Sequence, residues 1–196
     1  MKVPDNPSES LRRLNPHLFG TRPPPVEQVF DRLPRRTNAG RDGREWEGLV
    51  AEAASRYERD GVLRLRKVTP PARVVGGGKD RKVVFLDNPF LDFVGVWSAR
   101  GGRALLCECK DTSGDRLRLG DGGLTEKQME ALWQWHRSGA AAFVLWRANS
   151  GVCLVPAWEV AASASGGAMS VEFPCGFVVA QADPLRFLPA LEAAYP

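Results

Sequence analysis

The chain has 196 residues, of which 43% are hydrophobic and 26% are charged, and its formal net charge is +4. This length fits one domain with a tail better than two domains, and the hydrophobic fraction is enough for a sizeable core. There is no apolar stretch of about 18 residues and no signal peptide, so we expect a cytoplasmic protein with no membrane segment. The basic charge favours a polyanionic partner.

The four cysteines do not form a metal-binding pattern. They stand at positions 107, 109, 153 and 175, with no CxxC pair, and neither histidine lies at zinc-finger spacing from them. Cys107 and Cys109 belong to an apolar run, so we interpret them as small core residues in a reduced protein. The pattern excludes a zinc finger and a disulfide framework.

The first 39 residues differ in composition from the rest of the chain. They contain seven of the fifteen prolines together with six arginines. Segments of this kind do not bury enough apolar surface to fold on their own. We therefore expect a flexible, basic, proline-rich arm at residues 1–39, followed by a folded domain at residues 40–196.

The folded domain is predicted to begin with a helix. Asp42 as N-cap and Glu45 three residues later form a capping-box pattern. Apolar residues then recur at intervals of three or four from Trp46 to Tyr57, and Gly61 ends the run. The periodicity predicts an amphipathic helix packed on the domain core.

Five strands are predicted next. Val62–Val68 alternates in polarity, and Ala72–Leu86 has the pattern of a β-hairpin whose turn lies at 76–80. Two further strands run through Phe90–Trp97 and Ala104–Lys110, joined by the glycine-rich segment 98–103.

The second half returns to a helix and then to strands. After a polar loop at 111–123, Thr125 caps a helix that Gly139 terminates, and Trp133, Trp135 and Trp146 are predicted to lie in the core. A strand pair at 141–147 and 152–155 follows, then a small-residue loop at 161–168 and a terminal helix at 185–195. Helices alternating with strands in this way predict an α/β fold with a mixed central β-sheet flanked by helices.

The chemistry is concentrated in two of these strands. Side chains alternate between the faces of a strand, so Glu108 and Lys110 share one face and Cys107 and Cys109 share the other. Asp92 likewise interrupts the apolar strand before them. Buried charges are costly unless they are paired or bound to a metal. The residues therefore indicate either an internal ion pair or a magnesium site, since two carboxylates on adjacent strands can supply hard oxygen ligands.

A fourth acid has two open interpretations. By helical geometry Glu47 lies at the margin of the apolar face of the first helix, roughly 80–90° from its centre. It either reaches a cleft beside the sheet or remains in water. By contrast, the acid–basic–lysine triplet at 80–82 lies in a charged turn without an apolar strand, so we interpret it as a solvated loop.

Several segments resemble the RecU-type Holliday-junction resolvases, members of the PD-(D/E)XK nuclease superfamily, which has a restriction-endonuclease-like fold. The likeness rests on the order and spacing of four segments and extends over residues 40–196, through 124–129, the strand at 143–145 and the terminal helix. The four segments are Gly43–Glu47, Asp60–Pro70, Asp92–Val96 and Glu108–Thr112.

The resemblance implies an endonuclease that uses Mg²⁺, with Mn²⁺ as a substitute. Asp92, Glu108 and the backbone carbonyl of Cys109 match the metal ligands, and Lys110 matches the lysine that orients the attacking water and offsets charge in the transition state. Glu47 matches the helix acid that completes the catalytic set.

The resemblance also implies DNA contacts and a partner. Lys67 matches a basic residue near the scissile phosphate, and Gln128 matches a helix glutamine, although it is equally the N3 residue of a Thr125 capping box. The substrate would be a four-way DNA junction cut by a homodimer. We expect the basic residues of the predicted hairpin to bind DNA as well, namely Arg73, Lys79, Arg81 and Lys82.

Two departures from the family pattern affect these expectations. The segment between Pro70 and Asp92, which forms a protruding stalk in that family, is shorter here, and Leu91 stands where a proline often precedes the first acid. The shorter segment bears on junction selectivity more than on nuclease activity. Two other functions therefore stay open: a PD-(D/E)XK endonuclease acting on duplex or flapped DNA, and a non-catalytic DNA-binding recombination factor.

Overall fold

A computed structural model describes residues 39–69, 72–76, 79, 81–85, 91–179 and 186–196. The arm expected at 1–39 lies outside the described residues except for its last position. Among the described residues, no helix is both long enough and apolar enough to cross a membrane.

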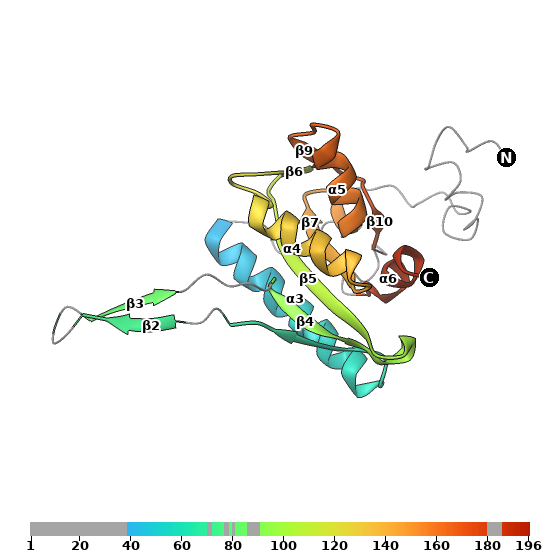
Figure 1. Cartoon of the computed structure of the whole chain (residues 1–196), viewed down its shortest axis with the longest axis horizontal. Helices are drawn as coiled ribbons and strands as arrows, with labels where there is room; N and C mark the ends of the chain where they lie inside the picture. The colour runs from blue at the N-terminus through green and yellow to red at the C-terminus, as the bar shows by residue number, and fades with distance from the viewer. Residues whose placement is uncertain (1–38, 70–71, 77–78, 80, 86–90, 180–185) are drawn as a thin grey trace. The chain divides into compact units, whose positions relative to one another are not determined.

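A six-stranded mixed sheet forms the centre of the fold (Figure 1). Its one parallel pairing joins the third and fourth strands in the order across the sheet, and the other neighbours are antiparallel. This arrangement confirms the predicted α/β class with a mixed central sheet flanked by helices. In spatial order the strands are β1 (Arg64–Lys67), β4 (Phe93–Trp97), β5 (Arg103–Asp111), β7 (Ala141–Ala148), β8 (Gly151–Pro156) and β10 (Phe177–Val178).

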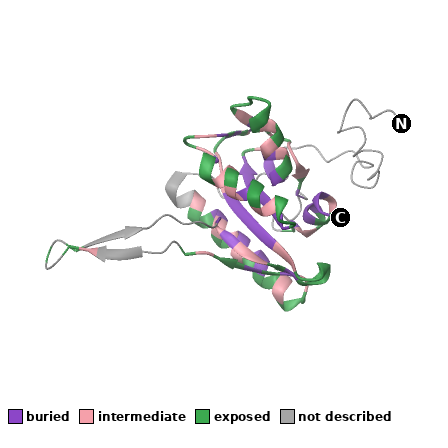
Figure 2. Cartoon of the chain, in the orientation of Figure 1, coloured by how far each residue is buried: buried purple, intermediate pink, exposed green. Residues whose placement is uncertain are grey.

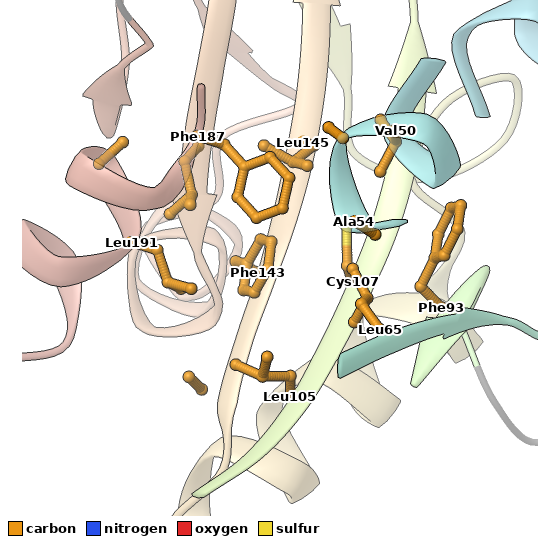
Figure 3. Close-up of a cluster of buried hydrophobic side chains, with 14 of the residues drawn as sticks. Val50, Ala54, Leu65, Phe93, Leu105, Cys107, Phe143, Leu145, Phe187 and Leu191 are labelled. Atoms are coloured by element: carbon orange, nitrogen blue, oxygen red, sulfur yellow. The ribbon is translucent and has the colours of Figure 1, made fainter. Parts of the chain in front are cut away.

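One face of this sheet is covered by α3 (Ala39–Arg59) and α6 (Leu188–Ala194). Odd-numbered residues of β5 and β7 point to this side and pack with the apolar stripe of α3 (Figure 3). Cys107 and Cys109 are buried here, which confirms their assignment to the core. The labelled side chains in Figure 3 include Val50, Phe93, Cys107, Phe143 and Leu191.

The opposite face is covered by α4 (Glu126–Arg137) and α5 (Ala157–Ser165). Even-numbered residues such as Leu106, Val144 and Trp146 pack there against Leu132 of α4. Both faces of β5 and β7 are therefore buried, as the purple strands in Figure 2 show. A charged side chain in the middle of β5 consequently lies between two layers of protein rather than in solvent.

β1 lies unusually close to β4 because Gly95 has no side chain. A Cβ atom at this position would lie 1.9 Å from the backbone oxygen of Arg64 on β1. The close pairing sets Lys67, the last residue of β1, opposite Phe93 at the start of β4.

Two small sheets lie outside the central one. The predicted hairpin is confirmed as β2 (Ala72–Val75) paired with β3 (Lys82–Phe85), although part of its turn is outside the described residues. In the second small sheet β6 (Arg116–Arg118) pairs with β9 (Ser170–Glu172). β6 falls within the segment 111–123 that was predicted to be a polar loop, and β9 lies where no strand was predicted. A short 3₁₀ turn, η4 (Ser98–Arg100), connects β4 to β5.

Most predicted boundaries are confirmed within a few residues, but three predictions were wrong. α3 begins at Ala39, so Asp42 lies inside the helix instead of capping it. The loop predicted at 161–168 is largely α5, because its alanines favour a helix more than its serines and glycines favour a turn. Trp133 is 39% exposed on the outer side of α4, whereas Trp146 is fully buried.

Candidate active site

Asp92 and Glu108 meet across two antiparallel strands. β4 pairs with β5 so that Phe93 faces Cys107, and continuing this register by one residue sets Asp92 opposite Glu108. The Asp92 carboxylate accepts a hydrogen bond at Oδ2 from the backbone N–H of Cys109, 2.8 Å away. Asp92 is therefore tied to the same strand that carries Glu108 and Lys110.

Glu108 is the most deeply buried acid of the group, with a side chain only 3% exposed. Its Oε1 atom lies 3.0 Å from Lys110 Nζ and accepts a hydrogen bond of 2.5 Å from Gln128 Nε2. Burial, followed by the negative charge of Asp92, raises the pKa of Glu108 from 4.5 to about 7, although Lys110 opposes the shift. The ion pair with Lys110 therefore does not fully offset the cost of burying the ionised Glu108 carboxylate.

The pKa of Asp92 is also raised above its usual value. Burial is the main cause, and the negative charge of Glu47 adds to it. The hydrogen bond from Cys109 and the charges of Lys110 and Lys67 act in the opposite direction. Two neighbouring carboxyl groups with raised pKa values indicate that the positive charge around them is too small to stabilise both in the ionised form.

Glu47 lies close enough to the site for its charge to act on Asp92. Its Oε2 atom lies 2.6 Å from Nζ of Lys67, and the Glu47 side chain is 22% exposed. The pair comes from α3 and the end of β1, and both of its charges act on Asp92. Of the two interpretations open for Glu47, the structure supports the one that turns it toward the sheet.

Gln128 combines the two properties that the sequence left as alternatives. It is the N3 residue of a complete capping box with Thr125 at the start of α4, which confirms that predicted cap. Its side chain also contacts Glu108 and accepts a hydrogen bond of 3.0 Å from Lys110 Nζ. α4 therefore begins directly above the charged part of β5.

The donor set suits a hard divalent cation. Asp92, Glu108 and the Cys109 backbone offer only oxygen, which favours Mg²⁺ or Mn²⁺ over zinc. Within the part of the chain that is described, no group of three or more His, Cys, Asp or Glu residues is arranged to hold a metal. Two carboxylates are enough for Mg²⁺, which usually keeps several water molecules and takes further oxygens from a phosphate. The raised pKa values show where a positive charge would stabilise the site.

The basic residues of the hairpin belong to a separate sheet. Arg73 and Lys82 lie on β2 and β3, and Lys79 and Arg81 are exposed. None of the contacts described above for Asp92, Glu108 or Lys110 involves them. Their predicted binding role stays a prediction, separate from the carboxylate site.

One buried ion pair beside the site was missed from the sequence. Asp111 Oδ2 lies 2.5 Å from Arg147 on β7, and both side chains are at most 5% exposed. The Arg147 guanidinium also lies 5.2 Å from the ring centre of Trp46, whose indole N–H donates to the Leu145 carbonyl at 3.1 Å. These contacts attach α3 to β7 at Trp46, the residue that precedes Glu47. The signal was present in the sequence, because Arg147 is a charged residue in an otherwise apolar strand.

Fold and site together define an α/β protein with a paired-carboxylate and lysine centre on its central sheet. No model of a protein family matches this chain, and no curated protein sequence matches it. Among solved structures, it is similar to Hjc, a Holliday junction resolvase from the archaeal hyperthermophile Archaeoglobus fulgidus. The match has 19% identity and a TM-score of 0.32, and it covers 54% of this chain and 73% of that one. A likeness this loose carries no weight for function beside the geometry of the site itself.

Proposed function

We propose that this protein is a Mg²⁺-dependent DNA endonuclease of the PD-(D/E)XK type. The observation that carries the proposal is the convergence of Asp92, Glu108 and Lys110 at one point of the central sheet. There the two carboxylates have raised pKa values, and the lysine lies 3.0 Å from one of them. Perturbed acids grouped with a lysine are typical of catalytic sites.

Each residue has a distinct role in this proposal. Asp92 and Glu108 bind the cation, with the Cys109 carbonyl as a third oxygen. A bound Mg²⁺ supplies a Lewis acid that makes a water molecule more acidic and offsets the charge of the phosphate. Lys110 positions the attacking water and stabilises negative charge on the phosphate. Glu47 is the third carboxylate of the proposed active site.

We infer that Lys67 contacts the DNA backbone. Its side chain is 47% exposed, although its ammonium pairs with Glu47 at 2.6 Å. An ammonium that is both close to the carboxylates and open to solvent can bind a phosphate as that phosphate approaches the cation. This contact would position the scissile phosphodiester without taking part in the chemistry.

The substrate we propose is a four-way DNA junction, cut by a homodimer in which each subunit nicks one strand. The net charge of +4 and the basic hairpin support a nucleic-acid partner. A twofold dimer would supply two matched sites for two symmetric cuts. Such an enzyme would act in homologous recombination and repair.

The test compares end-labelled four-way junction, linear duplex and flapped DNA, each with Mg²⁺ and with EDTA. We expect Mg²⁺-dependent nicking with preference for the junction, and loss of at least 100-fold in rate for Glu108→Gln. Glu172→Gln is the matched control, since Glu172 also pairs with a cationic side chain, that of Arg116, but at the surface of the small β6–β9 sheet.

Each alternative function predicts a different result in this assay. Equal cleavage of all three substrates would favour an endonuclease of another specificity in the same superfamily. Binding without cleavage at any metal concentration would contradict the nuclease proposal and favour a DNA-binding recombination factor.

A further inference from the structure

We propose that Gln128 is a positioning residue that holds the Glu108 carboxylate, and that the N-terminal cap of α4 sets the direction of its amide group. This inference rests on the proposed function and assigns Gln128 a role other than the DNA contact that the family resemblance implied. The capping box of α4 would then be part of the active site.

The contacts of the Gln128 amide determine its orientation. Its Oε1 atom accepts from Lys110 Nζ at 3.0 Å and from the Thr125 backbone N–H at 3.0 Å. An ammonium and a backbone N–H can only donate, so an amide turned the other way would place its NH₂ group against two donors. The oxygen must therefore face Lys110 and Thr125.

The NH₂ group of the Gln128 amide is consequently directed at Glu108. Gln128 Nε2 donates to Glu108 Oε1 over 2.5 Å, and Lys110 Nζ lies 3.0 Å from the same oxygen. Two donors on one oxygen fix the rotation of the carboxylate about its terminal bond. The position of the second oxygen, Oε2, is then fixed as well, which is what a metal ligand requires.

The local geometry of the chain explains why these groups meet. β5 ends at Asp111 and α4 begins at Glu126, and α4 connects β5 to its parallel neighbour β7. A crossover helix between parallel strands must start at the end of the sheet where the first strand finishes. The first turn of α4 is therefore delivered to the end of β5 that carries Glu108 and Lys110.

Substitution of Gln128 separates its two structural roles. Gln128→Glu keeps an acceptor for Thr125 and Lys110, so the capping box is preserved, but it removes the donor to Glu108. Gln128→Ala removes both. We expect either variant to lower kcat by about 10- to 100-fold, the usual effect of removing a group that orients a metal ligand. The DNA dissociation constant, measured with Ca²⁺, should change less than twofold.

Two further variants separate helix stability from the orientation of the amide. Thr125→Ala removes a hydroxyl that also donates to Gln128 Oε1 over 3.2 Å but leaves the backbone N–H that orients the amide, so kcat should fall less than in Gln128→Ala. Gln134→Ala removes a glutamine of the same helix whose side chain bonds to the exposed Glu130, and should leave kcat unchanged. Wild-type kcat in Gln128→Glu would overturn the inference. So would a raised DNA dissociation constant with unchanged kcat in Gln128→Ala, because that result describes a DNA contact.

A second readout does not depend on cleavage. Binding of Mn²⁺ to the protein without DNA, followed by the electron paramagnetic resonance signal of free Mn²⁺, should weaken about 10-fold or more in Gln128→Ala and not in Gln134→Ala. If the wild type binds Mn²⁺ but cuts no DNA, the proposed function fails, and these affinities alone decide the role of Gln128. A wild type that binds no Mn²⁺ would overturn both proposals.

Discussion

The backbone N–H of Cys109 donates to the Asp92 carboxylate across two strands, at 2.8 Å. Asp92 is thus held by the residue that lies between Glu108 and Lys110 in the sequence. One oxygen of Asp92 is engaged by the protein scaffold, which stabilises the strand pairing. The same acid is proposed to bind the cation, and these two roles make separable predictions.

Substitutions of Asp92 should separate its structural role, the hydrogen bond with Cys109, from its proposed role as a metal ligand. Asp92→Asn keeps an acceptor for Cys109 and removes a charge that opposes Glu108, so the melting temperature without metal should equal or exceed that of the wild type. Asp92→Ala leaves the Cys109 N–H without its partner and should cost about 1–3 kcal/mol. Both should lose Mn²⁺ binding by more than about 10-fold. Thermal unfolding in EDTA and Mn²⁺ titration measure the two effects, and an unfolded Asp92→Asn variant would contradict this division.

Glu108 should make the stability of the metal-free protein dependent on pH. Its pKa is about 7 in the folded chain against a usual 4.5, so between these values the folded state retains a proton that the unfolded state releases. The free energy of unfolding should therefore fall as pH rises from 4.5 to 7, by up to about 3 kcal/mol. Glu108→Gln should remove the part of this decline that Glu108 contributes in urea unfolding with EDTA and leave only what Asp92, whose pKa is also raised, contributes. A wild-type stability that rises over the same range, with no difference from the variant, would be contrary to the prediction.

Lys110 should matter for turnover and not for binding. Lys110→Ala is expected to lower the cleavage rate at least 100-fold while the DNA affinity in Ca²⁺ stays within about threefold. Lys110→Arg should not restore the rate, because a planar guanidinium does not reproduce the compact ammonium that contacts both Glu108 and Gln128. Single-turnover cleavage and equilibrium binding measure the two quantities. A Lys110→Ala variant that cuts at the wild-type rate would remove Lys110 from the active site.

The hairpin should contribute electrostatic DNA binding. Replacing Arg73, Lys79, Arg81 and Lys82 by glutamine should weaken binding and flatten its dependence on salt, by about 0.9 in logarithmic slope for each phosphate that is no longer neutralised. Replacing Lys79 and Arg81 alone should give part of this effect. The matched control replaces Arg59 and Arg137, which are also exposed but lie on α3 and α4. If replacing Arg59 and Arg137 reduced the salt dependence of binding as much as replacing Lys79 and Arg81, the effect would come from overall charge and not from a contact between the hairpin and DNA.

Paired incision predicts the products of mixed dimers. Wild-type subunits should linearise a supercoiled plasmid that carries a cruciform, whereas heterodimers with Glu108→Gln subunits should give nicked circles. The measurement is gel separation of the plasmid products after one binding event. A chain that sediments as a monomer and still linearises the plasmid in that event would contradict the dimer proposal.

Parts of the site could be predicted from the sequence because they depend on strand geometry. Glu108 and Lys110 stand out as charged residues on an apolar strand, and alternation of side chains places them on one face. Asp92 stands out in the same way on the neighbouring strand. The position of Glu47 could not be resolved, because the direction of a residue at the margin of a helix depends on how the helix packs, here through Trp46 and Arg147.

Other elements were missed because their partners are distant or their local signals conflict. β6 and β9 have three residues each and pair Arg116 with Glu172, so neither strand carries a periodicity that can be recognised alone. The start of α3 was misplaced because Asp42 has the chemistry of an N-cap although the helix continues before it. Gln128 satisfied a cap and a site equally well, and only the tertiary position of α4 shows that it does both.

The site is assembled from contacts that are close in the sequence, which has a consequence for the order of folding. The bonds from Asp92 to Cys109, from Lys110 to Gln128 and from Gln128 to Glu108 span 17, 18 and 20 residues. The bond from Trp46 to Leu145, which fastens α3 to the sheet, spans 99. Closing a short loop costs less chain entropy than closing a long one. We therefore expect the metal-binding strands and the start of α4 to form first during folding, and Glu47 to reach its place only when α3 docks.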